Sequence, residues 1–445
     1  MREWSVLPER EMLEQALVLA LLVNGRTVFQ ECIPTEENLR FAEVLKEFGL
    51  KFNTVGDQLV AEGVGFGYSV PIILPFDFSR QANTLILALA SKDLETTYTI
   101  LAETKEELAE KKELLLNVAK VFLKTETENS ISFSFEAKPY NIRTAKNGGV
   151  PYLQRNFALL SALVCGEDLK FEERFVVRDQ WTSMLKHFGV NVTYDLIVPE
   201  FKDEFERRMA KAQGIKMVKT WKTSLSETKT LPPREYFVPS DVTLASAYAL
   251  AAILSNEVER KQDVFLNVAC ATSRASVFTV LKRMGADLEF SGRHESYGEP
   301  FSNLVVKPLS SKRLQGCHFS GDSLAAAIEE IPILAVAACF AEKETIFHLP
   351  ENDVKRIHHL LEVLAVNLRK TGAEIGVYED GLVIRGKEEP DIAEFDCEGF
   401  PTIGLALSIL NALTKNHTPI IGIEATDKIF PHARKILNQI CGKES

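Results

Sequence analysis

The residue types that carry redox and metal chemistry are present in this chain, but their spacing does not suit that chemistry. Seven cysteines occur without a Cys-x-x-Cys pair, and Cys165 and Cys339 lie in apolar runs, where thiols act as small core residues. An odd count without motif spacing indicates a reducing compartment. His358 and His359 are neighbours, and neighbouring side chains on a helix point in different directions. The sequence therefore predicts no metal site.

Basic residues are concentrated between residues 200 and 230. A run of this kind is usually a solvated surface face, and nucleic-acid binding is the alternative. Acidic residues interleave, no nucleic-acid motif accompanies the run, and the whole chain carries a net charge of −11. We therefore expect no nucleic-acid partner. The basic residues are Lys202, Arg207, Arg208, Lys211, Lys216, Lys219, Lys222 and Lys229.

Length and composition are those of an ordinary globular protein. The chain has 445 residues, 46% hydrophobic and 25% charged, which suggests two or three domains. The start, Met1-Arg2-Glu3-Trp4, is not followed by the apolar stretch of a secretory signal. The apolar run 331–341 is far shorter than the roughly 20 residues that cross a bilayer. We expect a soluble, cytoplasmic monomer without membrane contact.

One phrase recurs four times, and it predicts a repeated helix-then-strand unit. The phrase is a leucine, three residues, a glycine and then a strand-like tail, beginning at Leu45, Leu185, Leu281 and Leu368. Lysine or arginine in the last turn suits the negative end of the helix dipole. The glycine provides the left-handed residue that ends the helix, and an alternating strand follows. The uneven spacing favours a few large units with insertions over a regular stacked array.

Several longer phrases resemble the enolpyruvyl transferases, most closely the EPSP synthase family. They follow one another in the family's order over nearly the whole chain, and only the region from Tyr68 to Tyr140 aligns poorly. UDP-N-acetylglucosamine enolpyruvyl transferase is a poorer match, because no cysteine falls in the poorly aligned central loop. The matching phrases are Leu7-Pro8 with Asn24-Gly25-Arg26-Thr27, 177–182, Val238-Pro239-Ser240-Asp241, 273–287, 328–338 and 426–431.

The resemblance implies an α/β fold of two similar domains, each made of three βαβαββ units around a pseudo-threefold axis. One domain would be residues 15–233, and the other would combine residues 1–14 with 234–445. The active-site cleft would lie between them.

The implied reaction transfers the enolpyruvyl (carboxyvinyl) group of phosphoenolpyruvate to shikimate 3-phosphate, in the shikimate pathway of aromatic amino acid biosynthesis, without a metal or cofactor. Both substrates are polyanions, so the site needs lysines and arginines near the oxygens that develop charge. It also needs a carboxylate to handle the hydroxyl proton. The implied partner is thus a small anion such as phosphoenolpyruvate or shikimate 3-phosphate.

Six residues occupy positions that the family uses in its site. Glu329 takes the place of the catalytic aspartate and Lys355 matches a family lysine, so both are predicted to be catalytic. Gln154, Arg178, Arg274 and Lys428 are predicted to bind substrate. Each also has an ordinary alternative: a lone lysine is normally a solvated surface residue, and Arg274 could cap the preceding segment.

Other site motifs are replaced. The opening Gly-Ser-Lys-Ser becomes the shorter Glu9-Arg10-Glu11-Met12, and the following Asn-Arg becomes Glu14-Gln15. The phosphoenolpyruvate loop falls on residues 76–83 without its glycines, and the Asp-His-Arg phrase falls on 400–402. Two hypotheses follow: an EPSP synthase with unusual residues, or a family scaffold that is inactive or repurposed to bind another small anion or a protein partner.

Overall fold

The computed structural model divides into two compact units, each made of separate stretches of the chain. Unit 1 contains Met1–Glu9, Pro34–Glu37 and Pro239–Ser445, and unit 2 contains Arg10–Ile33 and Asn38–Val238. The family resemblance implies domains at 15–233 and at 1–14 with 234–445. The described residues are 1–142, 150–173, 180–197, 203–212, 220–255, 262–271, 274–295, 298–309, 313–349, 351–388, 391, 393–414 and 418–443, without the side chains of 207, 210–212, 322–323 and 351–356.

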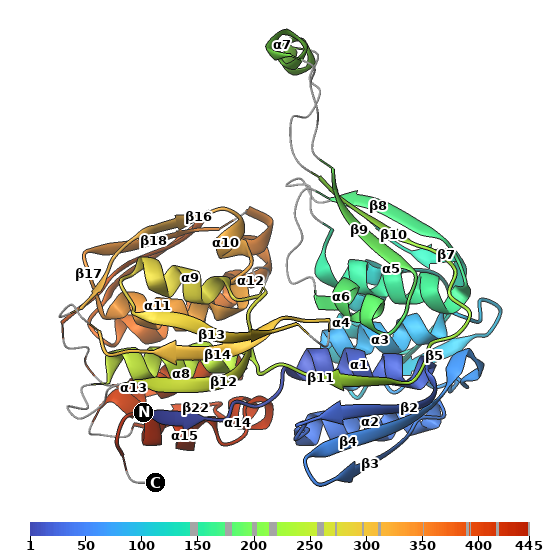
Figure 1. Ribbon diagram of the computed structural model, residues 1–445, viewed down its shortest axis with the longest axis horizontal. Coiled ribbons are helices and arrows are strands. Elements are labelled where there is room, and N and C mark those ends of the chain that lie inside the picture. The colour runs from blue at the N-terminus through green and yellow to red at the C-terminus, as the bar shows by residue number, and fades with distance from the viewer. Residues whose placement is uncertain are drawn as a thin grey trace. The chain divides into compact units, whose positions relative to one another are not determined.

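Unit 2 is built from three small sheets and a set of helices (Figure 1). The sheet orders are β11-β2-β4-β3, β5-β7-β6 and β8-β10-β9, and neighbouring strands are antiparallel except for β11 and β2. The strands are β2 (Asn24–Gln30), β3 (Lys51–Val55), β4 (Gln58–Val64), β5 (Tyr98–Leu101), β6 (Ala119–Glu126), β7 (Ser130–Tyr140), β8 (Leu169–Glu173), β9 (Val192–Ile197), β10 (Thr220–Leu225) and β11 (Arg234–Phe237). The helices are α1 (Arg10–Leu22), α2 (Glu36–Glu47, of which Glu36 and Glu37 belong to unit 1), α3 (Arg80–Ala90), α4 (Lys105–Val118), α5 (Tyr152–Cys165), α6 (Gln180–His187) and α7 (Glu204–Ala212).

Unit 1 repeats the same sheet pattern. Its larger sheets, β1-β12-β14-β13 and β16-β18-β20-β19, each begin with a parallel pair and continue antiparallel. Two short pairs, β15-β17 and β21-β22, complete it. The strands are β1 (Arg2–Trp4), β12 (Asp263–Ala269), β13 (Leu288–His294), β14 (Phe301–Val306), β15 (Leu314–Gln315), β16 (His318–Ser320), β17 (Ala341–Glu342), β18 (Glu344–His348), β19 (Glu374–Tyr378), β20 (Gly381–Arg385), β21 (Phe395–Asp396) and β22 (Ile420–Ile421). The helices are α8 (Val242–Leu254), α9 (Ser276–Arg283), α10 (Asp322–Ala325), α11 (Ile331–Cys339), α12 (Glu351–Arg369), α13 (Pro401–Leu413), α14 (Glu424–Ile429) and α15 (Ala433–Ile440).

The four repeated phrases end four helices in the same way. Gly49, Gly189, Gly285 and Gly372 all have positive φ, and the leucine four positions before each is fully buried. Backbone bonds after α2 and α6 close the helix end, with Leu50 N donating to Leu45 O and Val190 N to Leu185 O. The strands that follow, β3, β9, β13 and β19, each lie at the edge of a sheet. The predicted helix ends and strands are therefore confirmed.

Apolar helices fill the core of each unit. In unit 2, α1, α3 and α5 pack together, and residues 12–22 of α1 are all buried. In unit 1, α8, α11 and α13 take this role, and α11 is buried along its whole length. A helix that is hydrophobic all round belongs in a core.

One predicted element is too long. In the sequence, Leu108, Leu115 and Phe122 recur every seven residues within 103–123, which predicts a single amphipathic helix, but α4 ends at Val118 and β6 begins at Ala119. Ala119 is extended and pairs with Tyr140 of β7, so sheet pairing overrides the helical spacing.

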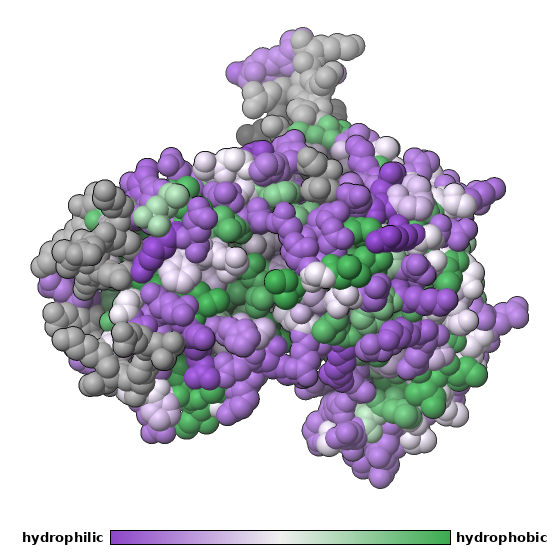
Figure 2. Space-filling view, turned by 60° about the horizontal axis from the view of Figure 1, so that its bottom comes forward, coloured by the Kyte–Doolittle hydropathy of each residue, from purple (hydrophilic) through white to green (hydrophobic). Residues whose placement is uncertain are grey.

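Hydrophilic residues cover much of the face drawn in Figure 2, with hydrophobic groups between them. In the described part of the chain, no helix has the length and apolarity to cross a membrane.

Candidate functional site

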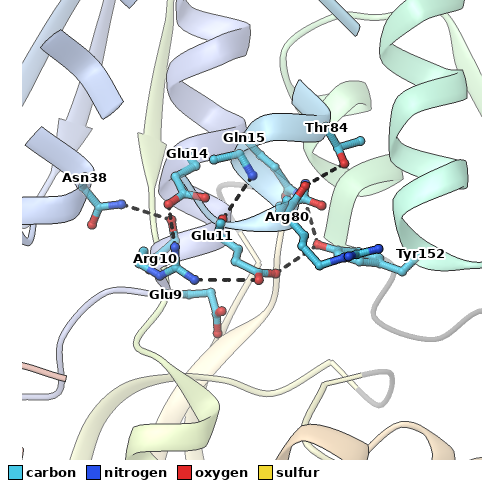
Figure 3. Close-up of polar contacts among 12 residues, drawn as sticks. Glu9, Arg10, Glu11, Glu14, Gln15, Asn38, Arg80, Thr84 and Tyr152 are labelled. Carbon is cyan, nitrogen blue, oxygen red and sulfur yellow. Dashed lines mark hydrogen bonds and ion pairs between the residues drawn. The ribbon is translucent and has the colours of Figure 1, made fainter. Parts of the chain in front are cut away.

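Polar side chains gather at the first turns of α1 and α5 in unit 2, around the hydroxyl of Tyr152 (Figure 3). The amide Nε2 of Gln15 donates to this oxygen at 3.0 Å, and Nε2 of Gln180 donates at 3.2 Å. The Tyr152 hydroxyl lies 3.5 Å from Oε2 of Glu11. Gln15 and Gln180 are buried, so their amides need such partners. Tyr152 therefore ties three elements together: α1, α5 and α6.

Arg10 opens α1, but its charge is already matched. Its Nη1 lies 2.9 Å from Oε1 of Glu14, and its Nη2 lies 4.0 Å from Oε1 of Glu11. Glu14 is buried, so this pair is shielded from water and its attraction is stronger than that of a surface pair. The side chain of Asn38 donates to the Arg10 carbonyl at 3.2 Å. One guanidinium thus faces two carboxylates at the helix end that would otherwise attract an anion.

The loop before α3, where the resemblance placed the phosphoenolpyruvate site, is bonded to itself. The Asn83 amide Nδ2 donates to the carbonyls of Phe76 and Phe78 at 3.2 and 3.1 Å. Its Oδ1 accepts the backbone N–H of Phe78 at 3.3 Å. Ser79 caps the helix, accepting the N–H of Ala82. These bonds take up backbone donors that a glycine-rich loop would direct at an anion.

The charges around this loop are also paired. Asp77 contacts Nζ of Lys111 at 2.5 Å, and Arg80 contacts Glu113 at 2.8 Å. Glu107 also contacts Nζ of Lys111, at 2.7 Å. Two acidic side chains thus contact Lys111. The described charges around the loop therefore leave no excess of positive charge.

Gln154, a predicted substrate-binding residue, points at α4. Its Nε2 donates to both the backbone carbonyl and Oδ1 of Asn117, each at 3.0 Å. Gln154 is buried. Its predicted role stays a prediction, and substrate contact would require the Asn117 bonds to be exchanged.

The neighbouring Arg155 was missed by sequence reasoning. Its side chain is 1% exposed, and its Nε lies 3.0 Å from Oε1 of Glu173, which is equally buried. Its Nη2 donates to the Thr182 hydroxyl at 2.8 Å. The only available signal was a charged residue near the start of an apolar helix. Arg155 joins α5 to β8 and α6.

Unit 1 holds a second buried polar group, at the first turns of α8 and α11. Arg274 forms an ion pair with Glu9, and both are buried. Glu330 accepts the Thr243 hydroxyl at 2.6 Å, and Asp241 caps α8 by accepting the Leu244 N–H at 2.7 Å. Burial, assisted by the charge of Glu9, raises the pKa of Asp241 to about 8. Arg274 was predicted to bind substrate, and the structure pairs it with an acid of its own unit.

The remaining predicted residues are spread over unit 1. Lys428 lies on α14 with 59% of its side chain exposed, and its Nζ is 3.2 Å from Oε1 of Glu37. Glu329 is half-buried in the short 3-10 turn 328–330. Lys355 lies on α12, but its side chain is outside the described part, and Arg178 is outside the described residues altogether.

Gln154 and Lys428 therefore each contact a residue that the sequence did not single out, and Arg274 contacts Glu9 of the replaced opening motif. Among the described side chains, no cluster of three or more histidine, cysteine or acidic residues could hold a metal ion.

Solved structures share this architecture over almost the full chain. EPSP synthase from Acinetobacter baumannii matches with a TM-score of 0.73 at 21% identity, covering 98% of this chain and 95% of that one. The enolpyruvyl transferase NikO from Streptomyces tendae matches with a TM-score of 0.65 at 12% identity, covering 99% and 94%. The fold is thus the α/β enolpyruvyl transferase fold, and the predicted fold class is confirmed.

Sequence comparisons identify the family within this fold class. The family model described as EPSP synthase (3-phosphoshikimate 1-carboxyvinyltransferase) matches residues 203–437. The chain belongs to the EPSP synthase family. The 3-phosphoshikimate 1-carboxyvinyltransferase of Petrotoga mobilis is 24% identical over 97% of this chain and 95% of its own length. That of a Synechococcus strain is 30% identical over 64% of this chain and 58% of its own length.

Proposed function

We propose that this chain is a divergent member of the EPSP synthase family that binds one small anion weakly and has lost fast carboxyvinyl transfer. Carboxyvinyl transfer from phosphoenolpyruvate to shikimate 3-phosphate requires cations directed at two polyanions. The main support for this proposal comes from the first turn of α1, where Arg10 is paired with Glu14 and Glu11 adds a further carboxylate.

The other described cations near the matched positions support the same proposal. Arg80 is paired with Glu113, Arg274 with Glu9, and Lys428 with Glu37. A substrate phosphate would have to displace these carboxylates. Loss of one preorganised donor typically costs about 2.7 to 4 kcal/mol of barrier, so several such losses exclude a normal rate.

Weak anion binding is assigned to the Arg178 side of the family site. Arg178 lies in the phrase that resembles the family's substrate-binding segment. A charge-assisted bond contributes roughly 1.5 to 3 kcal/mol, enough for weak affinity from one or two contacts. The ligand would be a phosphorylated or carboxylated small molecule, bound without the second anion.

Phosphate release tests the loss of transfer. With phosphoenolpyruvate and shikimate 3-phosphate present, we expect turnover to be absent or at least about a thousandfold below a typical median near 10 per second. The Petrotoga mobilis relative is the positive control for the assay. Turnover near 10 per second would overturn the proposal.

An active EPSP synthase is the second candidate. Similarity to the Petrotoga mobilis protein over 97% of this chain favours it. Calorimetric titration with shikimate 3-phosphate, then phosphoenolpyruvate, separates the two. An active enzyme binds both in sequence, whereas our proposal expects one weak binding event.

A further inference from the structure

The buried polar group of unit 1 joins two distant stretches of chain. Glu9 ends the N-terminal segment, and Asp241 lies where the chain re-enters unit 1 after Val238. The N–H of Glu9 donates to the Pro239 carbonyl at 2.8 Å, and the N–H of Asp241 donates to the Leu7 carbonyl at 2.8 Å. These reciprocal backbone hydrogen bonds hold segments 7–9 and 239–241 side by side.

Ser240 connects the same segments to the sheet. Its hydroxyl is 3.1 Å from the Val6 carbonyl and 2.9 Å from the Leu266 carbonyl of β12. Its backbone N–H donates to the Asn267 carbonyl at 2.8 Å. The end of stretch 1–9 and the start of stretch 239–445 are thus held at one place in unit 1.

The buried acids described at this place outnumber the buried cation. Glu9, Asp241 and Glu330 contribute three buried carboxyl groups, and Arg274, 1% exposed, contributes one guanidinium. Three ionised carboxylates around one guanidinium in a buried group would be costly, so a carboxyl group should retain a proton instead.

We propose that Asp241 is a proton-dependent latch, which holds segments 7–9 and 239–241 together while its carboxyl group is protonated and loosens them once it ionises. The proposal concerns unit 1 alone and does not depend on the proposed loss of transfer activity.

The surroundings of Asp241 support this assignment. Burial, the charge of Glu9 and the charge of Glu330 all raise its pKa, and Arg274 and the Leu244 N–H act in the opposite direction. Tyr248, on the same helix, faces Asp241 and has its own pKa raised mainly by burial. The net result for Asp241 is a pKa of about 8.

The sign of the pH dependence follows from linkage. An exposed aspartate has a pKa near 3.9, so the closed form binds more protons than the opened form between about pH 4 and 8. The latch is therefore strongest at low pH within this window. It weakens up to tenfold per pH unit as pH rises towards 8, and then levels off.

Hydrogen exchange of the full-length protein tests the latch. The backbone amides of Glu9, Ser240 and Asp241, whose acceptors are known, should lose roughly 50-fold in protection between pH 6 and 8, after correction for intrinsic exchange. Protection should change less than about twofold from pH 8 to 9.5. Amides of the β2-β4 pair in unit 2 are the internal reference.

Asp241→Asn imitates the protonated form and can still accept the helix-capping bond. Because the amide cannot ionise, its protection should not vary between pH 6 and 8 and should be at least that of wild type at pH 6. Asp203→Asn is the matched control, because Asp203 also accepts an N–H three residues on, from Glu206 at 2.8 Å, but is exposed. This control should keep the wild-type profile.

A second variant keeps the test decisive if Asp241→Asn folds poorly. Glu330→Gln removes one nearby negative charge while retaining an acceptor for Thr243, so protection should level off at a lower pH than in wild type. Protection that does not vary with pH in wild type, or an unchanged profile in folded Asp241→Asn or Glu330→Gln, would overturn the latch.

Discussion

Arg10 and Glu14 lie one helical turn apart on α1, with Nη1 of the arginine 2.9 Å from Oε1 of the glutamate. Glu14 is 2% exposed, so the pair is largely shielded from solvent. The cation at the start of this core helix is therefore matched within its own helix.

Releasing Arg10 from this pair should strengthen anion binding. In Glu14→Gln, sulfate or phosphate should raise the thermal midpoint more than in wild type, because the guanidinium loses its nearer carboxylate. Glu47→Gln makes the same charge change at an exposed position at the end of α2. Thermal melts with and without sulfate measure the difference, and equal anion shifts in Glu14→Gln and Glu47→Gln would contradict it.

Sulfate or phosphate should also stabilise the wild-type protein to heat, and Arg178→Ala should abolish that shift. Lys428→Ala should change it less, because Lys428 is exposed and already paired with Glu37 at 3.2 Å. The same melts provide the measurement. If wild type and Arg178→Ala shift equally, the anion binds elsewhere, and a scaffold that serves a protein partner becomes the better interpretation.

The Arg155–Glu173 pair should be among the most sensitive contacts in unit 2. Removing one partner of a buried ion pair leaves an uncompensated charge, so Glu173→Gln should lower the free energy of unfolding by about 3 to 5 kcal/mol. The adjacent Glu172 is exposed, and Glu172→Gln should stay within about 0.5 kcal/mol of wild type. Urea denaturation measures the free energy of unfolding of both variants. Similar losses in Glu173→Gln and Glu172→Gln would show that the Arg155–Glu173 pair does not stabilise the fold.

The repeated helix ends can be tested at Gly285. Its φ is +95°, and a methyl group added at its Cα would meet no atom within 4 Å, so Gly285→Ala tests conformation without a clash. We expect a loss of about 1 to 2 kcal/mol, the usual cost of a left-handed residue with a side chain. Gly67→Ala, also in open space but without positive φ, is the control. Equal unfolding free energies for the two variants would count against a required left-handed cap.

Local features were predictable from the sequence because they depend on residues close in the chain. The leucine-to-glycine phrase at Leu45, for example, closes a helix through a bond from Leu50 N to Leu45 O, within a single turn of chain. Core helices such as α11 were recognisable from their unbroken apolar runs. The end of α4 was not, because strand pairing between Ala119 and Tyr140 decides it.

The partners of the site residues were decided only by the tertiary structure. Glu9 pairs with Arg274 across 265 positions of sequence, and Gln15 bonds to Tyr152 across 137. The sequence by itself identified Arg274 and Gln154 as family positions and located the replaced motifs around Glu11. It could not indicate that these groups would be neutralised or occupied, because electrostatic pairing depends on distance and burial in the folded chain. Folding brings the first turns of α1 and α5 together in unit 2 and the starts of α8 and α11 together in unit 1, and that proximity determines which charges are matched.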